Sequence, residues 1–256
     1  MDIGLVEVLA SASLVLVAVG LSLWKGLGIE RSLLWSATRA AIQLLAVGVL
    51  FRFIFDSSQS MLWAVLWVTA MLLLSAETIG RRAKKVGGVR VAAITAMGVA
   101  LIISLGVIFG LNVFELEPVT LVVTAGITLG NTVPAVVLGV NTAAKAFSEH
   151  PARTEGLLAL GMEPSKVSRF LTPEAVRQAL IPQIERTKVV GLIALPGAMT
   201  GMLLAGSDAI SAVLVQIVIL YLILGSVSIA VVSIATTVAM RAFTPDARLA
   251  AWVTAG

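Results

Sequence analysis

Long apolar runs separated by short polar segments dominate the pattern of this chain. A helix needs about 20 mostly apolar residues to cross the hydrocarbon core of a bilayer. The pattern predicts an all-α polytopic membrane protein with about seven transmembrane helices, forming a single transmembrane domain over residues 1–256. The predicted spans are Leu5–Leu23, Leu33–Phe55, Met61–Ile79, Val91–Leu111, Val119–Val140, Val189–Ala205 and Ile210–Met240.

The polar segments between the runs alternate in charge. Basic residues follow every odd-numbered run, as in Lys25 and Arg31, in Arg81–Lys85, and in Arg241 with Arg248. The even-numbered connections are acidic or neutral, as in NVFELEP between the fourth and fifth runs. Because cytoplasmic loops carry the excess of Lys and Arg, this alternation predicts an N-terminus outside and a cytoplasmic C-terminus.

Composition supports the membrane prediction. The chain is 59% hydrophobic and 12% charged, whereas a soluble domain has about 45–50% apolar and about 25% charged residues. The positive charge is concentrated in the loops between the apolar runs, which favours membrane topology and no nucleic-acid partner. The absence of Cys excludes disulfides, Cys-ligated zinc and a cysteine nucleophile.

The segment between the fifth and sixth runs, about residues 145–188, is a long basic loop with helical signals. Ala152–Leu160 has helical composition and Gly161 suits the left-handed position that ends a helix. Pro164 suits the first position of a second short helix. Thr172, Pro173 and Glu174 predict the start of a third helix, as N-cap, first residue and acidic first-turn residue.

Apolar side chains stand out within this charged loop. They are Leu157, Leu158, Leu160 and Met162. In one interpretation they pack back against neighbouring loops. In the other they form an apolar knob that docks into a groove of a soluble partner.

Polar residues inside the predicted spans are candidates for function, because ionisable groups are costly in hydrocarbon. Arg39 and Gln43 lie four residues apart on one face of the second run. Glu77 lies near the cytoplasmic end of the third run. A structural pair between Arg39 and Glu77 is one interpretation, and the cytoplasmic mouth of a cation path is the other.

The fifth and sixth runs contain further polar or helix-breaking residues. Asn131 lies in the middle of the fifth run and needs a hydrogen-bond partner. Pro196 and Gly197 permit a break in the sixth run. Met199 follows them, and its thioether is either a soft metal ligand or ordinary apolar filler, so the sequence leaves the metal ligands unknown.

Four blocks of the sequence resemble the FetB-type iron-export permeases, a bacterial family with plant relatives linked to aluminium tolerance. The segment from Glu155 to Pro164, with Arg169 and Pro173 beyond it, also resembles the coupling-loop motif of ABC-transporter permeases. The four blocks are RAAIQLLAVGVLFRFIF (Arg39–Phe55), AGITLGN (Ala125–Asn131), EGLLALGMEP (Glu155–Pro164) and RQALIPQIERTKVVGLIALPGAMTGMLLAG (Arg177–Gly206).

The resemblance implies a permease subunit of an ABC transporter in the bacterial cytoplasmic membrane, exporting a metal ion, with iron as the default. It implies a homodimer and a separate ATP-binding subunit that carries ATP and Mg, with no cofactor in this chain. The sequence contains no G-x-x-x-x-G-K-[ST] phosphate loop, which agrees with an ATPase on another chain. The implied contact with that subunit comprises Glu155, Leu157, Leu158, Leu160, Gly161, Met162 and Pro164.

Three alternatives stay open at this stage. A secondary transporter would work without ATP and use a charge such as Glu77 as a proton relay. An intramembrane enzyme is disfavoured, because the sequence has no recognisable nucleophile–base or metal motif. An ABC permease for an organic solute, such as a nucleotide sugar, would keep the class and change the substrate.

Overall fold

The computed structural model describes residues 4–83, 86–149, 151–246 and 248–254, and in these ranges all regular structure is helical. Lys84 and Lys85, part of the predicted basic segment after the third run, lie outside them. The helices are α1 (Leu5–Lys25), α2 (Glu30–Asp56), α3 (Ser60–Arg82), α4 (Val89–Gly110), α5 (Pro118–Ser148), α6 (Pro151–Ala159), α7 (Pro164–Lys188), α8 (Gly197–Leu204), α9 (Ala209–Arg241) and α10 (Ala251–Thr254). The chain divides into two compact units, Met1–Ser60 and Met61–Gly256.

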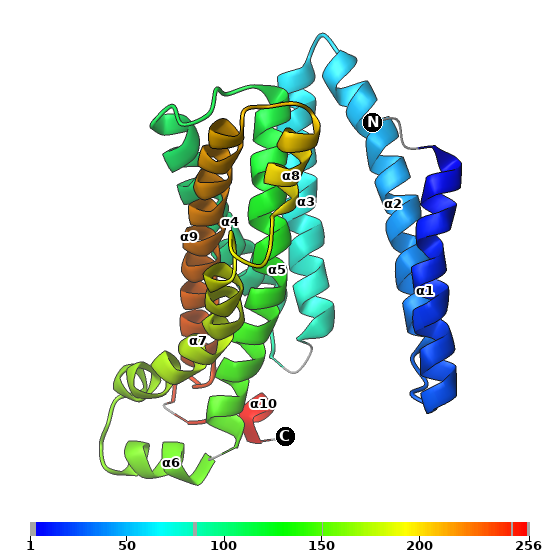
Figure 1. Cartoon of the computed structure of the whole chain (residues 1–256). Helices are drawn as coiled ribbons and strands as arrows, with labels where there is room; N and C mark the ends of the chain where they lie inside the picture. Colours follow the sequence, from blue (N-terminus) through cyan, green and yellow to red (C-terminus); the bar gives the residue numbers. More distant parts are fainter. Residues whose placement is uncertain (1–3, 84–85, 150, 247, 255–256) are drawn as a thin grey trace. The chain divides into compact units, whose positions relative to one another are not determined.

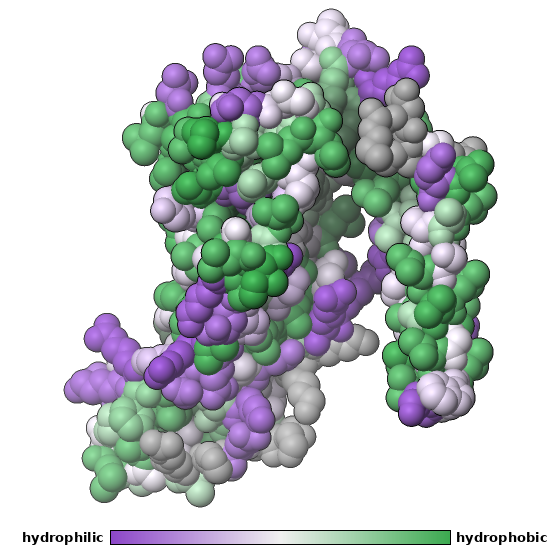
Figure 2. All heavy atoms as spheres, in the orientation of Figure 1, coloured by the Kyte–Doolittle hydropathy of each residue, from purple (hydrophilic) through white to green (hydrophobic). Residues whose placement is uncertain are grey.

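The N-terminal unit is a pair of packed helices, α1 and α2 (Figure 1). Gly26 ends α1 in the left-handed conformation (φ 62°), which a residue without a Cβ adopts without strain. The Ser22 hydroxyl donates a 2.7 Å hydrogen bond to Glu30 Oε1 across the turn. Hydrophobic side chains cover most of this pair, as expected for helices that face lipid (Figure 2).

In the C-terminal unit, α5 and α9 pack along each other and are flanked by α4 and α7. Small residues allow a close approach at this contact. A Cβ on Gly139 would lie 3.4 Å from Ile234 and 3.5 Å from Val231. Such small-residue contacts are the usual packing device between transmembrane helices, where lipid supplies no hydrophobic drive.

The predicted sixth span, Val189–Ala205, is not one helix. α7 ends at Lys188, Gly191 takes a left-handed conformation (φ 89°) and its N–H donates to the Ala194 carbonyl at 2.9 Å. Pro196 then precedes the eight-residue α8. The upper part of α7, this turn and α8 therefore run beside α9 as a broken segment (Figure 1).

Six of the described helices are long and apolar enough to cross a membrane, namely α1, α2, α3, α4, α5 and α9. The broken α7–α8 segment occupies the place of the remaining predicted span. This agrees with the predicted count of about seven and with the all-α class. The predicted sides of the two termini stay a prediction.

The start of a third loop helix at Thr172 is wrong, because α7 continues from Pro164 through Pro173 and Pro182 to Lys188. The Thr172 hydroxyl donates to the Ser168 carbonyl at 2.7 Å inside this helix. Val167 and Leu171 are buried before Pro173 and Ala175 follows it on the same stripe. Packing of this stripe outweighs the one backbone hydrogen bond that Pro173 removes.

Candidate functional site

A kink-prone stretch of α5 lies near the middle of the bundle. Asn131 is 13 residues from Pro118, the first residue of α5, which is about 20 Å along the helix. Its Nδ2 donates to the Ile127 carbonyl at 2.8 Å, so the amide has the partner that the sequence demanded. Pro134 lacks an N–H, and the Gly130 carbonyl one turn earlier therefore loses its helical donor.

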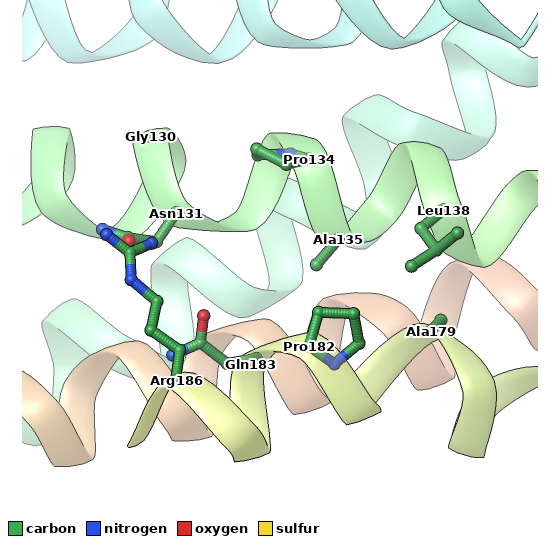
Figure 3. Close-up of a pocket in the computed structure, with 9 residues that line it drawn as sticks. All are labelled: Gly130, Asn131, Pro134, Ala135, Leu138, Ala179, Pro182, Gln183 and Arg186. Atoms are coloured by element: carbon green, nitrogen blue, oxygen red, sulfur yellow. The ribbon is translucent and has the colours of Figure 1, made fainter. Parts of the chain in front are cut away.

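A cavity of about 220 Å³ opens between this stretch and α7. Figure 3 shows Arg186 extending from α7 with its guanidinium toward Asn131, while Pro182 lies across from Ala135. The lining residues are Gly130, Asn131, Pro134, Ala135 and Leu138 of α5 and Ala179, Pro182, Gln183 and Arg186 of α7 (Figure 3).

A second cavity of about 90 Å³ shares Asn131, Gln183 and Arg186 with the first. It continues toward α9 and the start of α8, where Pro196 and Gln216 line it. The two cavities therefore meet at one polar cluster, which we call the mid-bundle cluster: Asn131, Gln183, Arg186 and Gln216.

Gln216 fixes the start of α8 against α9. Its side chain is only 7% exposed, and its Oε1 accepts a 3.3 Å hydrogen bond from the Met199 N–H. Pro196 is the N-cap of α8 and Gly197 its first residue. The structure thus brings three sequence-predicted residues, Asn131, Pro196 and Met199, into one neighbourhood.

Sequence reasoning missed Gln183, Arg186 and Gln216. The first two were assigned to the end of a cytoplasmic loop, because α7 is too polar to read as a membrane helix. A signal for Gln216 was present, since it is a single amide within the apolar run Ile210–Met240. An amide in such a run needs an internal partner, which here is the backbone of α8.

Glu77 is not part of the mid-bundle cluster. Its Oε1 accepts from Arg81 Nε at 2.8 Å, and its Oε2 lies 2.7 Å from Arg90 Nε. Both oxygens are thus engaged by α3 and α4, away from the residues that line the two cavities. Arg39 and Gln43 are exposed residues of the N-terminal unit, so their link to Glu77 stays a prediction.

No group of three or more His, Asp or Glu side chains able to hold a metal ion occurs in the part of the chain that the structure describes. Met199 is half-buried beside Gln216. A thioether role in metal binding stays a hypothesis for this residue.

The second candidate region is the α6–α7 elbow, residues 155–164. Gly161 has a left-handed backbone (φ 83°) after α6, and Pro164 starts α7, as the sequence predicts. Leu157, Leu158 and Met162 pack against a core that contains Phe147 of α5 and Val253 of α10. Leu160 instead is 83% exposed, and Glu155 is also exposed.

The packing interpretation therefore holds for three of the four apolar side chains, and the docking interpretation stays open for Leu160. Leu157, Leu158 and Met162 hold the elbow on the bundle. Leu160 and Glu155 face outward and are free to meet a partner. A docking role for the elbow remains a prediction that these positions support.

The helices and the polar cluster within their bundle define a multi-pass membrane protein. The chain matches the model of the family described as "Uncharacterised protein family (UPF0014)" over residues 5–243, and it belongs to this family.

Its relatives include bacterial and plant proteins. It is 31% identical over 219 residues to "Probable iron export permease protein FetB" of Escherichia coli, covering 86% of this chain and 84% of that protein. It is 30% identical over 225 residues to "UPF0014 membrane protein STAR2" of rice, covering 88% and 78%. It is 30% identical over 232 residues to "Protein ALUMINUM SENSITIVE 3" of Arabidopsis thaliana, covering 88% and 82%. No solved structure matches the chain.

The family expected from the four sequence blocks is thereby confirmed. The family match runs through all four blocks, from Arg39 to Gly206.

Proposed function

We propose that this protein is the permease subunit of a two-component ABC transporter and exports a metal ion, with iron as the first candidate. The observation that carries the proposal is the similarity, over most of both chains, to a protein named a probable iron export permease. The transport path would pass the mid-bundle cluster, because a cavity that contains the polar side chains of Asn131, Gln183 and Arg186 beside apolar helices suits a solute path.

In this proposal ATP binds and is hydrolysed on a separate subunit, which also binds Mg. Two copies of the chain would form a homodimer in the bacterial cytoplasmic membrane, so that two ATPases meet two elbows. The elbow suits this role because its apolar base is fixed on the bundle while Leu160 faces outward.

A secondary transporter receives less support from the geometry. Proton-coupled transporters use Asp, Glu or His side chains as proton relays inside the membrane. Glu77 is engaged by Arg81 and Arg90 instead, and neither cavity of the mid-bundle cluster is lined by an acidic residue.

The docking claim is tested with Gly161→Arg. This change strains a left-handed turn and places a long cation beside Leu160, so both ATPase co-purification and stimulation of ATP hydrolysis should be lost. Gly206→Arg is the matched control, because Gly206 has a similar left-handed backbone (φ 86° against 83°) in the α8–α9 turn. If Gly161→Arg retains both properties, the docking claim is wrong.

The identity of the transported ion is tested in a separate experiment. Proteoliposomes that contain the permease and its ATPase should move iron when ATP is added on the ATPase side. Movement without ATP under an ion gradient would favour a secondary transporter. Unchanged iron content of cells that express or lack the pair under iron overload would contradict metal export.

A further inference from the structure

Arg186 is an exposed cation that lines both cavities of the mid-bundle cluster. It faces Asn131 of α5, about 20 Å from the start of that helix (Figure 3). Within the described ranges its guanidinium forms no ion pair and no hydrogen bond. Its sequence neighbour Glu185 pairs with Lys188 at 2.7 Å and lines neither cavity. The Arg186 side chain is exposed in the single chain, and no acidic residue lines either cavity, so its charge is available to a guest that enters them.

The groups around Arg186 add hydrogen-bond donors. Gln216 is almost fully buried, and Met199 occupies its Oε1. Its Nε2 donor has no hydrogen-bond partner among the described residues, and Gln216 lines the smaller cavity. Gln183 contributes a second side-chain amide to both cavities. The mid-bundle cluster thus offers one fixed positive charge and several donors to a guest.

The same cavities are unsuited to a bare metal cation. None of the residues that line them is acidic, and the described ranges hold no acidic or histidine cluster for a metal. Hard cations such as ferric iron prefer carboxylate oxygens, and Arg186 repels a free cation at short range. A metal that passes this point would have to bring its own oxygen ligands.

We infer that the mid-bundle cluster binds a carboxylate-bearing anion, with the Arg186 guanidinium gripping one carboxylate and the Gln216 and Gln183 amides donating to others. Guanidinium and carboxylate match as a two-bond fork, which explains why an arginine lies here. Resting on the proposed metal export, the inference also states that the metal crosses as an anionic polycarboxylate chelate.

Binding is measured on the full chain in phosphatidylcholine nanodiscs, with citrate, iron(III)–citrate and inorganic phosphate as probes. Wild type should bind iron(III)–citrate, and Arg186→Gln should weaken binding by about ten-fold or more, since it removes charged hydrogen bonds. Arg186→Lys should recover only part of the affinity, because an ammonium has no fork. Arg177→Gln, on the same helix but outside both cavities, is the charge-matched control and should bind as wild type does.

Each outcome has one meaning. Equal affinities of wild type and Arg186→Gln, or no binding of any probe, would overturn the site. Binding of citrate but not of iron(III)–citrate would support the anion site and overturn the chelate. Binding of phosphate as tight as that of citrate would overturn the assignment to carboxylates.

Transport separates this inference from the proposed function. ATP-driven iron export by Arg186→Gln at the wild-type rate would refute the site and leave the function standing. Arg186-dependent citrate binding without any ATP-driven iron export would refute the function and leave the site standing. Thermal unfolding and size-exclusion profiles of each variant exclude misfolding as a cause.

Discussion

Three prolines shape the two cavities of the mid-bundle cluster. They are Pro134, Pro182 and Pro196. Pro134 and Pro182 each remove one helical hydrogen bond, and both line the larger cavity. Pro196 ends the turn after α7 and lines the smaller cavity. The cavity walls therefore follow from where prolines interrupt helices, and Arg186 and Gln216 then supply the chemistry.

Asp208 is another single residue with a measurable effect. It is the N-cap of α9, and its carboxylate accepts a 3.0 Å hydrogen bond from the Ser211 N–H. This backbone hydrogen bond lowers the pKa of Asp208 from its ordinary value of 3.8. Because the folded pKa is depressed, the carboxylate stabilises the fold above pH 3.8, and this contribution is lost as pH falls through the lowered value.

We expect Asp208→Ala to lower the Tm at pH 7 and Asp208→Asn to lower it less, since asparagine also caps helices. The Tm difference between wild type and Asp208→Asn should shrink as the pH falls below 3.8. Thermal unfolding in nanodiscs at pH 7 and at a pH below 3.8 measures this Tm difference. A Tm difference that is constant with pH would show that the charge of Asp208 contributes nothing.

At the scale of elements, long apolar runs predicted α1 to α5 and α9, because length and hydropathy alone define a membrane helix. At Val189–Ala205 the break that Pro196 and Gly197 permit is present, whereas the turn at Gly191 was not predicted from this apolar run. The sequence pattern also missed the continuity of α7 across Pro173, which depends on burial of side chains such as Val167 against other helices. Tertiary contacts of this kind leave no local signal.

The sequence predicted part of the candidate site, as it predicted part of the fold. Asn131 and Pro196 were found because a polar or helix-breaking residue is conspicuous inside an apolar run. Arg186 was missed because its surroundings in the sequence are as charged as those of a loop. Its position beside Asn131 depends on the packing of α7 against α5 and α9, which is seen only in the fold.

The elbow predicts two separable phenotypes. Leu157→Ala removes a partly buried side chain and should cost roughly 1–2 kcal/mol of stability, below the about 2–5 kcal/mol of a fully buried leucine. Leu160→Ala alters an exposed side chain, so stability should stay within about 0.5 kcal/mol. It should nevertheless weaken ATPase co-purification.

Paired measurements of Tm and ATPase co-purification decide this prediction. Full retention of the ATPase by Leu160→Ala would place the contact elsewhere on the elbow. A large fall in its Tm would show that Leu160 packs inward.

At the scale of the whole molecule, the basic segments of the C-terminal unit gather at one end. Arg241 at the end of α9 donates a 2.6 Å hydrogen bond to the Gly88 carbonyl, which ties α9 to the α3–α4 connection. The elbow and α10 lie at the same end as this contact (Figure 1). The acidic α4–α5 connection lies at the opposite end (Figure 1). This separation is the arrangement that the charge alternation predicts.

The cysteine-free sequence makes the topology directly testable. Single cysteines at Ser58 and Ser207 should react with a membrane-impermeant maleimide added outside cells. A cysteine at Ser165 should react only after permeabilisation. Ser165 lies in the first turn of α7 and Ser207 follows α8, so reaction of both from the same side would show that the broken α7–α8 segment does not cross.

The core beneath the elbow has a mechanical consequence. It joins the ends of α5, α7 and α9 to α10 through buried contacts, with Phe147 edge-on to Phe243 at 5.7 Å. A force applied at the elbow would therefore reach the ends of these helices together. The nearest missing backbone hydrogen bond is at Pro173 of α7, and Pro182 of α7 and Pro134 of α5 follow, so the helices would bend at these prolines when the elbow moves.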